Sequence, residues 1–399
     1  MKKLLLFVVS FFLFFVAFSQ TFTVLNSGTG NQLNGIRLLS DNKGIVVGDG
    51  GKILMTTNGL NWLSKISGVT TNLKDVEYIN PTTMIVVGDW GTILKTTNGG
   101  MGWTPISSGT TEMLHSVSVN GSNVYACGQN GVILKSTNEG DSWTSINPGP
   151  GAHIFKVLFT SPTVGYAVGN DGYIFRTNNA GASWAPYDLG ISTDFQLRGI
   201  YFTDVNNGYV VGKNLVLNQA IIIRTTNGGG TFIPQIIYAT SYVDIKFLNS
   251  STGFILSQNL DANTSAIFKT IDGGNNWNLQ TGFSKAQTNM AFSSLNIGYT
   301  CGFNGSIFKS TNINLGIEDL ENDQVISVYP NPCSEKITIF MDASIQAQNL
   351  IVEVYSISGE KLISQSNNEY IDISDIPIGA YLLKVQSESN VWTKKIIKE

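Results

Sequence analysis

The sequence predicts an all-β protein, in which a seven-bladed β-propeller of four-stranded blades precedes a small C-terminal β-sandwich. A segment of about 40 residues recurs seven times before residue 315, with the apolar and polar alternation of β-strands. Only 13% of the residues are charged and 42 are glycine, a composition that suits short strands joined by turns. After residue 324 the repeat gives way to a different set of short alternating segments.

Residues 1–19 are expected to be a secretory signal peptide. Lys2 and Lys3 precede an apolar run from Leu4 to Phe18, and small residues stand at the spacing of a cleavage site. A membrane anchor is the alternative, but the run is shorter than the roughly 20 residues of a spanning helix. The mature chain would begin at Gln20 and would be secreted.

Each repeat is expected to contain four strands, which in the second unit are residues 73–80, 83–88, 92–97 and 102–107. An Asn or Asp stands in the turn before each outer strand, where its side chain can accept backbone hydrogen bonds. A propeller makes this turn once per blade, so the recurring residue predicts a structural anchor and not a set of ligand sites. The anchors are Asn58, Asn98, Asn138, Asn179, Asn227, Asp272 and Asn312.

The seventh unit stops near residue 315 without an outer strand. Residues 21–36 resemble residues 102–117, which form an outer strand and the start of the next inner strand. We therefore expect the N-terminal strand to complete the last blade and close a propeller over residues 20–315. Closure would remove the exposed strand edges that promote aggregation.

The repeat resembles the Asp-box (BNR-type) propeller repeat. Residues 197–212 and 222–229 are similar to propellers of the photosystem II assembly and stability factor family. The resemblance implies the fold and, by analogy, an assembly role for a membrane-protein partner. Sialidases, xyloglucanases and sortilin-type receptors use similar boxes, so it does not define the function.

Residues 316–324 are expected to be a linker, and residues 325–399 a β-sandwich. The segments "YPNP" (329–332), "IPIGAYLLKV" (376–385) and "KKIIKE" (394–399) resemble the C-terminal sorting domain of the type IX secretion system, the por-type tail of Bacteroidota. This resemblance implies recognition by the secretion machinery and passage across the outer membrane. Tail removal would then release the protein or attach it to surface lipopolysaccharide. An ordinary carbohydrate-binding sandwich is the less favoured alternative.

Composition excludes several classes of function. The net charge of −4 argues against a nucleic-acid-binding protein. Two histidines and three cysteines make a metal site or a disulfide framework improbable, and no cofactor is expected. Cys127 and Cys301 occupy a strand position that is apolar in other units, so both are expected to be buried. A sialidase is rejected because at most two of the four arginines, Arg37 and Arg198, lie away from the anchor turns.

Candidate ligand-binding residues are expected on the face opposite the anchors. Trp90 and Phe303 place aromatic rings in turns between second and third strands, where they would stack on a sugar, hold a protein partner, or pack on a neighbouring loop. Residues 213–220 and 258–266 lengthen the same turn in units five and six. These insertions would form a wall beside the central funnel, or represent neutral variation of a tolerant loop.

The inner strands begin on the same face, where they would present Lys74, Asp75, His115, Lys156, Arg198 and Asp244. Asp75 and Asp244 could act as the carboxylate pair of a glycoside hydrolase. A solvated rim of mixed charge is the favoured interpretation.

The preferred hypothesis is a secreted or cell-surface binding or scaffold module without catalytic activity, whose ligand is a protein or a glycan. The alternatives are a glycan-acting hydrolase that uses funnel carboxylates, and an assembly factor for a membrane protein. The last would require a contiguous basic patch built from Lys74, Lys156 and Arg198.

Overall fold

The computed structural model describes residues 22–311 and 326–398, except for 147, 149–152, 192, 218, 238–240, 295–296, 342–349, 357–360, 367–369 and 387–390. The chain divides into two compact units, Met1–Ile313 and Asn314–Glu399. The expected signal peptide, the expected linker and the anchor Asn312 lie outside the described residues. Within those residues, no helix is long and apolar enough to cross a membrane.

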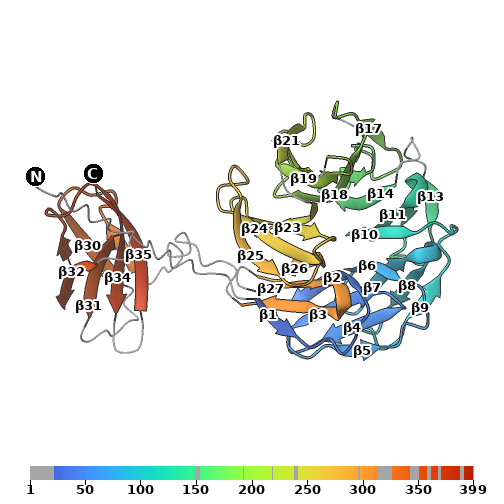
Figure 1. Ribbon diagram of the computed structural model, residues 1–399, viewed down its shortest axis with the longest axis horizontal. Helices are drawn as coiled ribbons and strands as arrows, with labels where there is room; N and C mark the ends of the chain where they lie inside the picture. Colours follow the sequence, from blue (N-terminus) through green and yellow to red (C-terminus); the bar gives the residue numbers. More distant parts are fainter. Residues whose placement is uncertain are drawn as a thin grey trace, which may run out of the picture. The chain divides into compact units, whose positions relative to one another are not determined.

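The first unit contains seven four-stranded antiparallel sheets arranged in a ring (Figure 1). We number these blades 1 to 7 in chain order, and each runs from an inner strand to an outer strand. Blades 1 to 3 are β2 (Leu33–Ser40), β3 (Lys43–Gly48), β4 (Lys52–Thr56), β5 (Leu63–Lys65); β6 (Leu73–Tyr78), β7 (Met84–Gly88), β8 (Ile93–Thr96), β9 (Thr104–Ile106); and β10 (Leu114–Asn120), β11 (Asn123–Gly128), β12 (Ile133–Ser136), β13 (Thr144–Ile146).

Blades 4 to 6 follow the same order. They are β14 (Ile154–Phe159), β15 (Gly165–Gly169), β16 (Ile174–Thr177), β17 (Ala185–Tyr187); β18 (Phe195–Phe202), β19 (Gly208–Asn214), β20 (Ala220–Thr225), β21 (Ile233–Ile237); and β22 (Tyr242–Phe247), β23 (Gly253–Asn259), β24 (Thr264–Thr270), β25 (Asn278–Phe283).

Blade 7 combines the two ends of the repeat region. It consists of β26 (Gln287–Phe292), β27 (Gly298–Gly302), β28 (Ile307–Ser310) and, as the outer strand, β1 (Phe22–Leu25). β1 pairs antiparallel with β28, with Phe22 opposite Ser310 and Leu25 opposite Ile307. The predicted closure by the N-terminal strand is confirmed.

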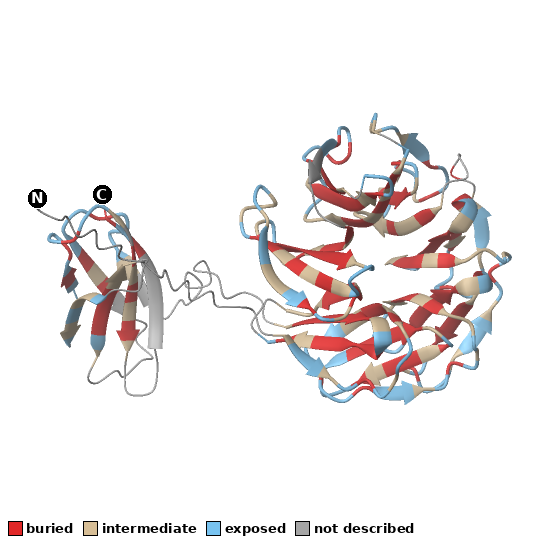
Figure 2. Ribbon diagram, viewed as in Figure 1, coloured by how far each residue is buried: buried red, intermediate tan, exposed pale blue. Residues whose placement is uncertain are grey.

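The apolar cores lie between neighbouring blades. Ile45 and Val47 of blade 1 pack in one cluster with Leu73 and Val76 of blade 2. Second strands such as β7 are buried along their whole length, whereas outer strands are largely exposed (Figure 2). Because each core is shared by two blades, an open ring would leave two apolar faces in water.

The anchor turns share one hydrogen-bond pattern. Asn58 Oδ1 accepts the backbone N–H groups of Leu60 at 3.0 Å and Asn61 at 2.9 Å, while the Thr56 hydroxyl accepts the N–H of Gly59 at 2.9 Å. In the other described anchors, a side-chain oxygen accepts the backbone N–H of the residue four positions later, in place of the two and three positions seen for Asn58; these are Asn98, Asn138, Asn179, Asn227 and Asp272. The turn therefore satisfies its own donors.

Four blades are also joined to the next by a buried tyrosine on the second strand. Each phenol donates a hydrogen bond to a carbonyl in the following anchor turn: Tyr125 to Ala180 (2.8 Å), Tyr166 to Gly228 (2.8 Å), Tyr209 to Gly273 (2.6 Å) and Tyr299 to Gly59 (2.9 Å). The last contact joins blade 7 to blade 1. Sequence analysis did not predict these contacts, although the tyrosines recur at one position of the repeat.

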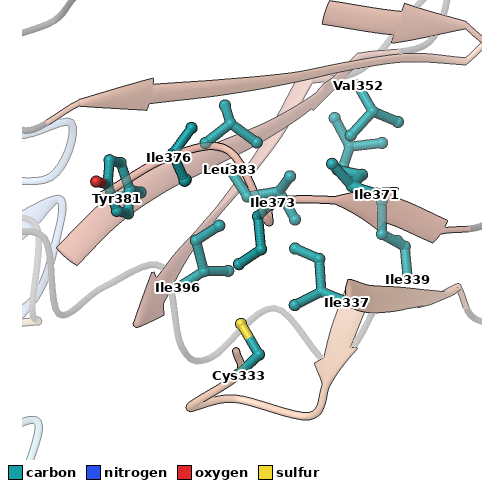
Figure 3. Packing of buried hydrophobic residues seen from close by; sticks show 12 residues of the cluster. Cys333, Ile337, Ile339, Val352, Ile371, Ile373, Ile376, Tyr381, Leu383 and Ile396 are labelled. Atoms are coloured by element: carbon teal, nitrogen blue, oxygen red, sulfur yellow. The ribbon is translucent and has the colours of Figure 1, made fainter. Parts of the chain in front are cut away.

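The second unit is a β-sandwich. β29 (Ile326–Tyr329), β30 (Lys336–Met341) and β33 (Tyr370–Asp372) form one sheet, and β32 (Lys361–Ser366), β31 (Ile351–Ser356), β34 (Gly379–Gln386) and β35 (Val391–Lys398) form the other. Ile337 and Ile371 of the first sheet contact Val352, Leu383 and Ile396 of the second in one core (Figure 3). Cys333 packs in the same core, and all three cysteines are free and buried, as expected for Cys127 and Cys301.

Candidate functional site

Every inner strand of the ring carries a β-bulge near its start. The pairing register shifts by one residue between Leu33 and Gly35, and at the equivalent point of the other six blades. The bulged residues are Asn34, Lys74, His115, Phe155, Arg198, Val243 and Thr288, and all seven line one pocket of about 340 Å³. We call this pocket the funnel. A bulge re-aims a side chain, which explains how seven strands supply one residue each.

The rest of the funnel wall comes largely from the ends of second strands with the turns after them, and from the residues that follow the bulges. Gln258, Leu260 and Phe303 belong to the first group, and Asp75, Lys156, Asp244 and Asn289 to the second; Gln32 and Met113 precede inner strands. The candidates Lys74, Asp75, His115, Lys156, Arg198, Asp244 and Phe303 therefore meet in one place. Trp90 does not line the funnel.

Asp75 is not part of a solvated rim, because only 2% of its surface is exposed. Its carboxylate lies 3.1 Å from Arg37 of blade 1 and 3.3 Å from Lys156 of blade 4. It also accepts hydrogen bonds from the Ser116 hydroxyl at 3.1 Å and the Val117 N–H at 3.3 Å, both in blade 3. Burial alone would raise the pKa of Asp75, but the two cations and the backbone donors hold it below its usual value.

Asp244 is buried in the same manner, at 3% exposure. Its carboxylate accepts the N–H groups of Ile245 at 3.0 Å and of Met290 in blade 7 at 3.4 Å, and it lies 3.6 Å from Lys246. The expected solvated rim is thus wrong for both aspartates. A general acid needs a raised pKa, and the surroundings of Asp75 produce the opposite shift.

Most cations near the funnel are already paired. Lys74 lies 3.5 Å from Asp89 and 3.7 Å from Asp49, and Lys156 is bound to Asp75. Both lysine side chains are partly buried, at 21% and 13% exposure. Lys74, Lys156 and Arg198, the cations expected of an assembly factor, do line one pocket, but the two lysines are ion-paired there.

Three bulged side chains from neighbouring blades, His115, Phe155 and Arg198, lie in contact in a row. The His115 ring lies 5.1 Å from the Phe155 ring, and the Arg198 guanidinium lies 5.0 Å from the centre of the Phe155 ring. Burial, together with the nearby His153, Lys74 and Arg198, lowers the pKa of His115 to about 4. His115 is consequently neutral near pH 7, and the series offers an apolar surface that ends in one cation.

The two aromatic candidates occupy different positions in equivalent turns. Phe303 is the first residue of its 3₁₀ turn and faces the funnel, whereas Trp90 is the second residue of the Asp89–Gly91 turn. Trp90 is 76% exposed and adopts the left-handed conformation, with φ 58° and ψ 34°. Asn130 and Asn304 hold the same position in their turns. Trp90 is therefore an exposed ring on a backbone that favours asparagine or glycine.

The two insertions lie beside the funnel. A second cavity of about 500 Å³ is lined by Arg198, Lys213 and Ser241 together with residues 258–262. The tips expose apolar side chains, with Leu215 at 54%, Val216 at 70% and Leu260 at 54% exposure. Among the described residues, no cluster of three or more His, Cys, Asp or Glu side chains is placed to bind a metal ion.

Sequence analysis missed the bulged residues Asn34, Phe155, Val243 and Thr288. A bulge adds one residue to a strand, so simple alternation assigns the wrong face from that point on. An alignment of all seven repeats on their anchors would have placed these residues at one equivalent position. That shared position was the signal in the sequence that could have identified them.

Two family models match the chain. Residues 327–399 match the secretion system C-terminal sorting domain, and residues 54–151 match the photosynthesis system II assembly factor YCF48. The second unit is a type IX sorting domain. No curated protein sequence matches the chain.

Solved structures support the propeller fold. YCF48 bound to D1 peptide is 14% identical, with a TM-score of 0.60 over 73% of this chain and 97% of that one. YCF48 from Cyanidioschyzon merolae is 16% identical, with a TM-score of 0.57 over 72% and 98%. The GH74 xyloglucanase from Xanthomonas campestris is 11% identical, with a TM-score of 0.58 over 92% and 59%. At these identities the likeness concerns the fold alone.

Proposed function

We propose that the protein is a non-catalytic binding module, exported by the type IX system, that captures a polypeptide segment in its funnel. The C-terminal sorting domain directs the chain to the cell surface or the exterior. The expected signal peptide would carry it across the inner membrane first. The ligand belongs to the funnel because the seven bulges bring side chains of every blade to that one pocket.

The chemistry of the funnel supports binding over hydrolysis. Asp75 and Asp244 accept backbone hydrogen bonds from the next blade, so their oxygens already stabilise the ring. The pKa of Asp75 is lowered, which keeps this carboxylate from acting as a proton donor at neutral pH. The series His115, Phe155 and Arg198 instead provides an apolar surface with a cationic end, a combination suited to a protein ligand.

A polypeptide is favoured over a glycan by two observations. Among the described residues, the most exposed aromatic side chain of the propeller, Trp90, lies outside the funnel, and the Arg198 guanidinium lies over one face of the Phe155 ring. A sugar would therefore have at most one face of this ring to stack on, whereas apolar side chains of a peptide can also pack against its edge. YCF48, a propeller of similar fold, has been solved with a bound peptide.

The test is a selection from a random peptide library on the chain from Gln20 to Glu399, with a glycan array measured in parallel. Selected peptides are then titrated against Phe155→Ala and against Leu63→Ala, whose side chain is 63% exposed on the outer strand of blade 1. We expect the Phe155 change to weaken binding by about tenfold or more and the Leu63 change to leave it unaltered. Binding of glycans only, or of peptides insensitive to Phe155→Ala, would overturn the proposal.

A further inference from the structure

The cavity between the insertions of blades 5 and 6 is a candidate subsite next to the funnel. We call it the side groove and define it by Arg198, Lys213, Ser241, Gln258, Leu260 and Asp261. Arg198, Gln258 and Leu260 also line the funnel, so the two cavities are continuous. Its volume of about 500 Å³ is large enough for one or two side chains of a ligand.

Arg198 differs from the other cations of this region. Arg37, Lys74, Lys156 and Lys246 each lie within 4 Å of a carboxylate. Arg198, by contrast, forms no ion pair with any described residue; its guanidinium donates to the neutral Gln196 side chain at 2.9 Å and rests on Phe155. Its Nε is buried without an acceptor in the part of the chain that the structure describes. A partly buried guanidinium without a counter-charge is a costly arrangement unless an anion binds it.

Lys213 brings a second cation to the side groove. Burial, and then the neighbouring Arg198, lower the pKa of Lys213, whereas Asp261 raises it. Neither cation has a carboxylate within ion-pair distance among the residues described, although the exposed Asp261 lines the same cavity. One bound carboxylate would relieve the repulsion between the two cations and supply the counter-charge that Arg198 lacks among the described residues.

We infer that the side groove binds a carboxylate of the polypeptide captured by the funnel, through Arg198 and Lys213. The inference rests on the proposed function and adds that the ligand is acidic. A phosphate group would fit the fork of Arg198 as well, but its second charge would be repelled more strongly by Asp261. A single negative charge, added to that of Asp261, balances the two positive charges of Arg198 and Lys213.

The test compares three probes by thermal unfolding of the chain from Gln20 to Glu399 at constant ionic strength. They are the peptide acetyl-Leu-Glu-Leu-Glu-amide, its Gln counterpart and inorganic phosphate, each at 10 mM. We expect only the Glu peptide to raise the Tm, by about 2 °C for a dissociation constant near 1 mM. Arg198→Gln and Lys213→Gln should each abolish this shift, while Lys43→Gln, in the β2–β3 hairpin, should preserve it.

The outcomes separate this inference from the proposed function. Equal shifts with both peptides would leave peptide capture standing and overturn the acidic preference. A shift with phosphate as large as that with the Glu peptide would overturn the assignment to a carboxylate. No shift with any probe would also overturn the side groove as an anion site, whereas the library selection judges peptide capture independently. Two variants, Arg198→Gln and Lys213→Gln, are used in case one of them misfolds. The result for a variant counts only if its Tm in the absence of a probe is not lower than that of the native chain.

Discussion

The carboxylate of Asp75 connects four blades. Asp75 belongs to blade 2, and its partners Arg37, Ser116 and Lys156 belong to blades 1, 3 and 4. Arg37 also binds Glu77 at 2.8 Å, so the charges of this region are compensated locally. At the residue scale, this acid, expected on a solvated rim and only alternatively as a catalytic group, joins neighbouring blades.

Replacing Asp75 by Asn should destabilise the propeller by about 3 kcal/mol, because Lys156 would lose its described counter-charge and Arg37 would keep only Glu77. The pKa of Asp75 is lowered in the folded state, so its contribution is complete above the unfolded pKa and is lost as pH falls through the lower folded value. Unfolding free energies measured from pH 7 down to pH 3 should therefore decline less steeply below about pH 4 in Asp75→Asn than in the native chain. Asp171→Asn, an exposed change at a left-handed position, should follow the native curve.

Trp90→Asn should stabilise the protein. The left-handed conformation costs a bulky residue about 1 kcal/mol, asparagine tolerates it, and a ring that is 76% exposed loses little burial. The reverse change, Asn304→Trp, at the equivalent position of blade 7, should cost a similar amount. Chemical denaturation measures both. A native chain that is more stable than Trp90→Asn would mean that the ring makes contacts worth more than the backbone strain.

At the scale of elements, the outer strands carry a regular signal. Pro105, Pro186 and Pro234 stand opposite Leu94, Phe175 and Ile223, which hold the same position of the repeat in blades 2, 4 and 5. Val24 holds this position opposite Phe308 in blade 7. Proline lacks an N–H, so at this position the N–H points away from the sheet. The residues before and after this position must then direct their N–H groups toward the third strand, where these groups form the hydrogen bonds of the pairing.

Val24→Pro should accordingly be tolerated, whereas Thr23→Pro should remove a hydrogen bond between β1 and β28 and destabilise the closed ring by about 3 kcal/mol. Urea unfolding of the two variants compares them directly. Equal destabilisation by both would contradict the assigned register of the closing strand.

The repeats were sufficient to predict the blades and the closure, because anchors about 40 residues apart recur whatever the side chains between them do. The bulges were not predictable from one unit, since Lys74 and Asp75 each fit an alternating strand in one of two registers. The roles of Asp75 and Arg198 were beyond sequence reasoning for another reason. The role of Asp75 depends on ion-pair partners 38 to 81 residues away, and that of Arg198 on having no carboxylate partner among the described residues.

At the scale of the whole molecule, the C-terminal strand completes the sandwich through its last described residue. Lys398 is 8% exposed, and its ammonium group donates to the carbonyls of Ile373 at 2.7 Å, Ser374 at 2.5 Å and Ile376 at 2.5 Å. Strand β35 is thereby tied to the segment that connects β33 and β34.

Lys398→Met should lower the stability of the sandwich by about 2 kcal/mol, because buried carbonyls would lose their donor. Calorimetry should show a lower transition for this unit and an unchanged one for the propeller. Lys361→Met, at an ammonium group that is 51% exposed, should have little effect on either. A shift of the propeller transition by Lys398→Met would contradict independent cores in the two units.

The most direct test of funnel binding is hydrogen–deuterium exchange of the chain from Gln20 to Glu399, with and without a peptide from the library selection. We expect protection at the starts of the inner strands, in residues 32–35, 72–75, 113–116, 153–156, 195–199, 241–244 and 286–289, and in the loop at 258–263. Protection confined to the anchor turns or to the outer strands would place the ligand elsewhere and contradict the account.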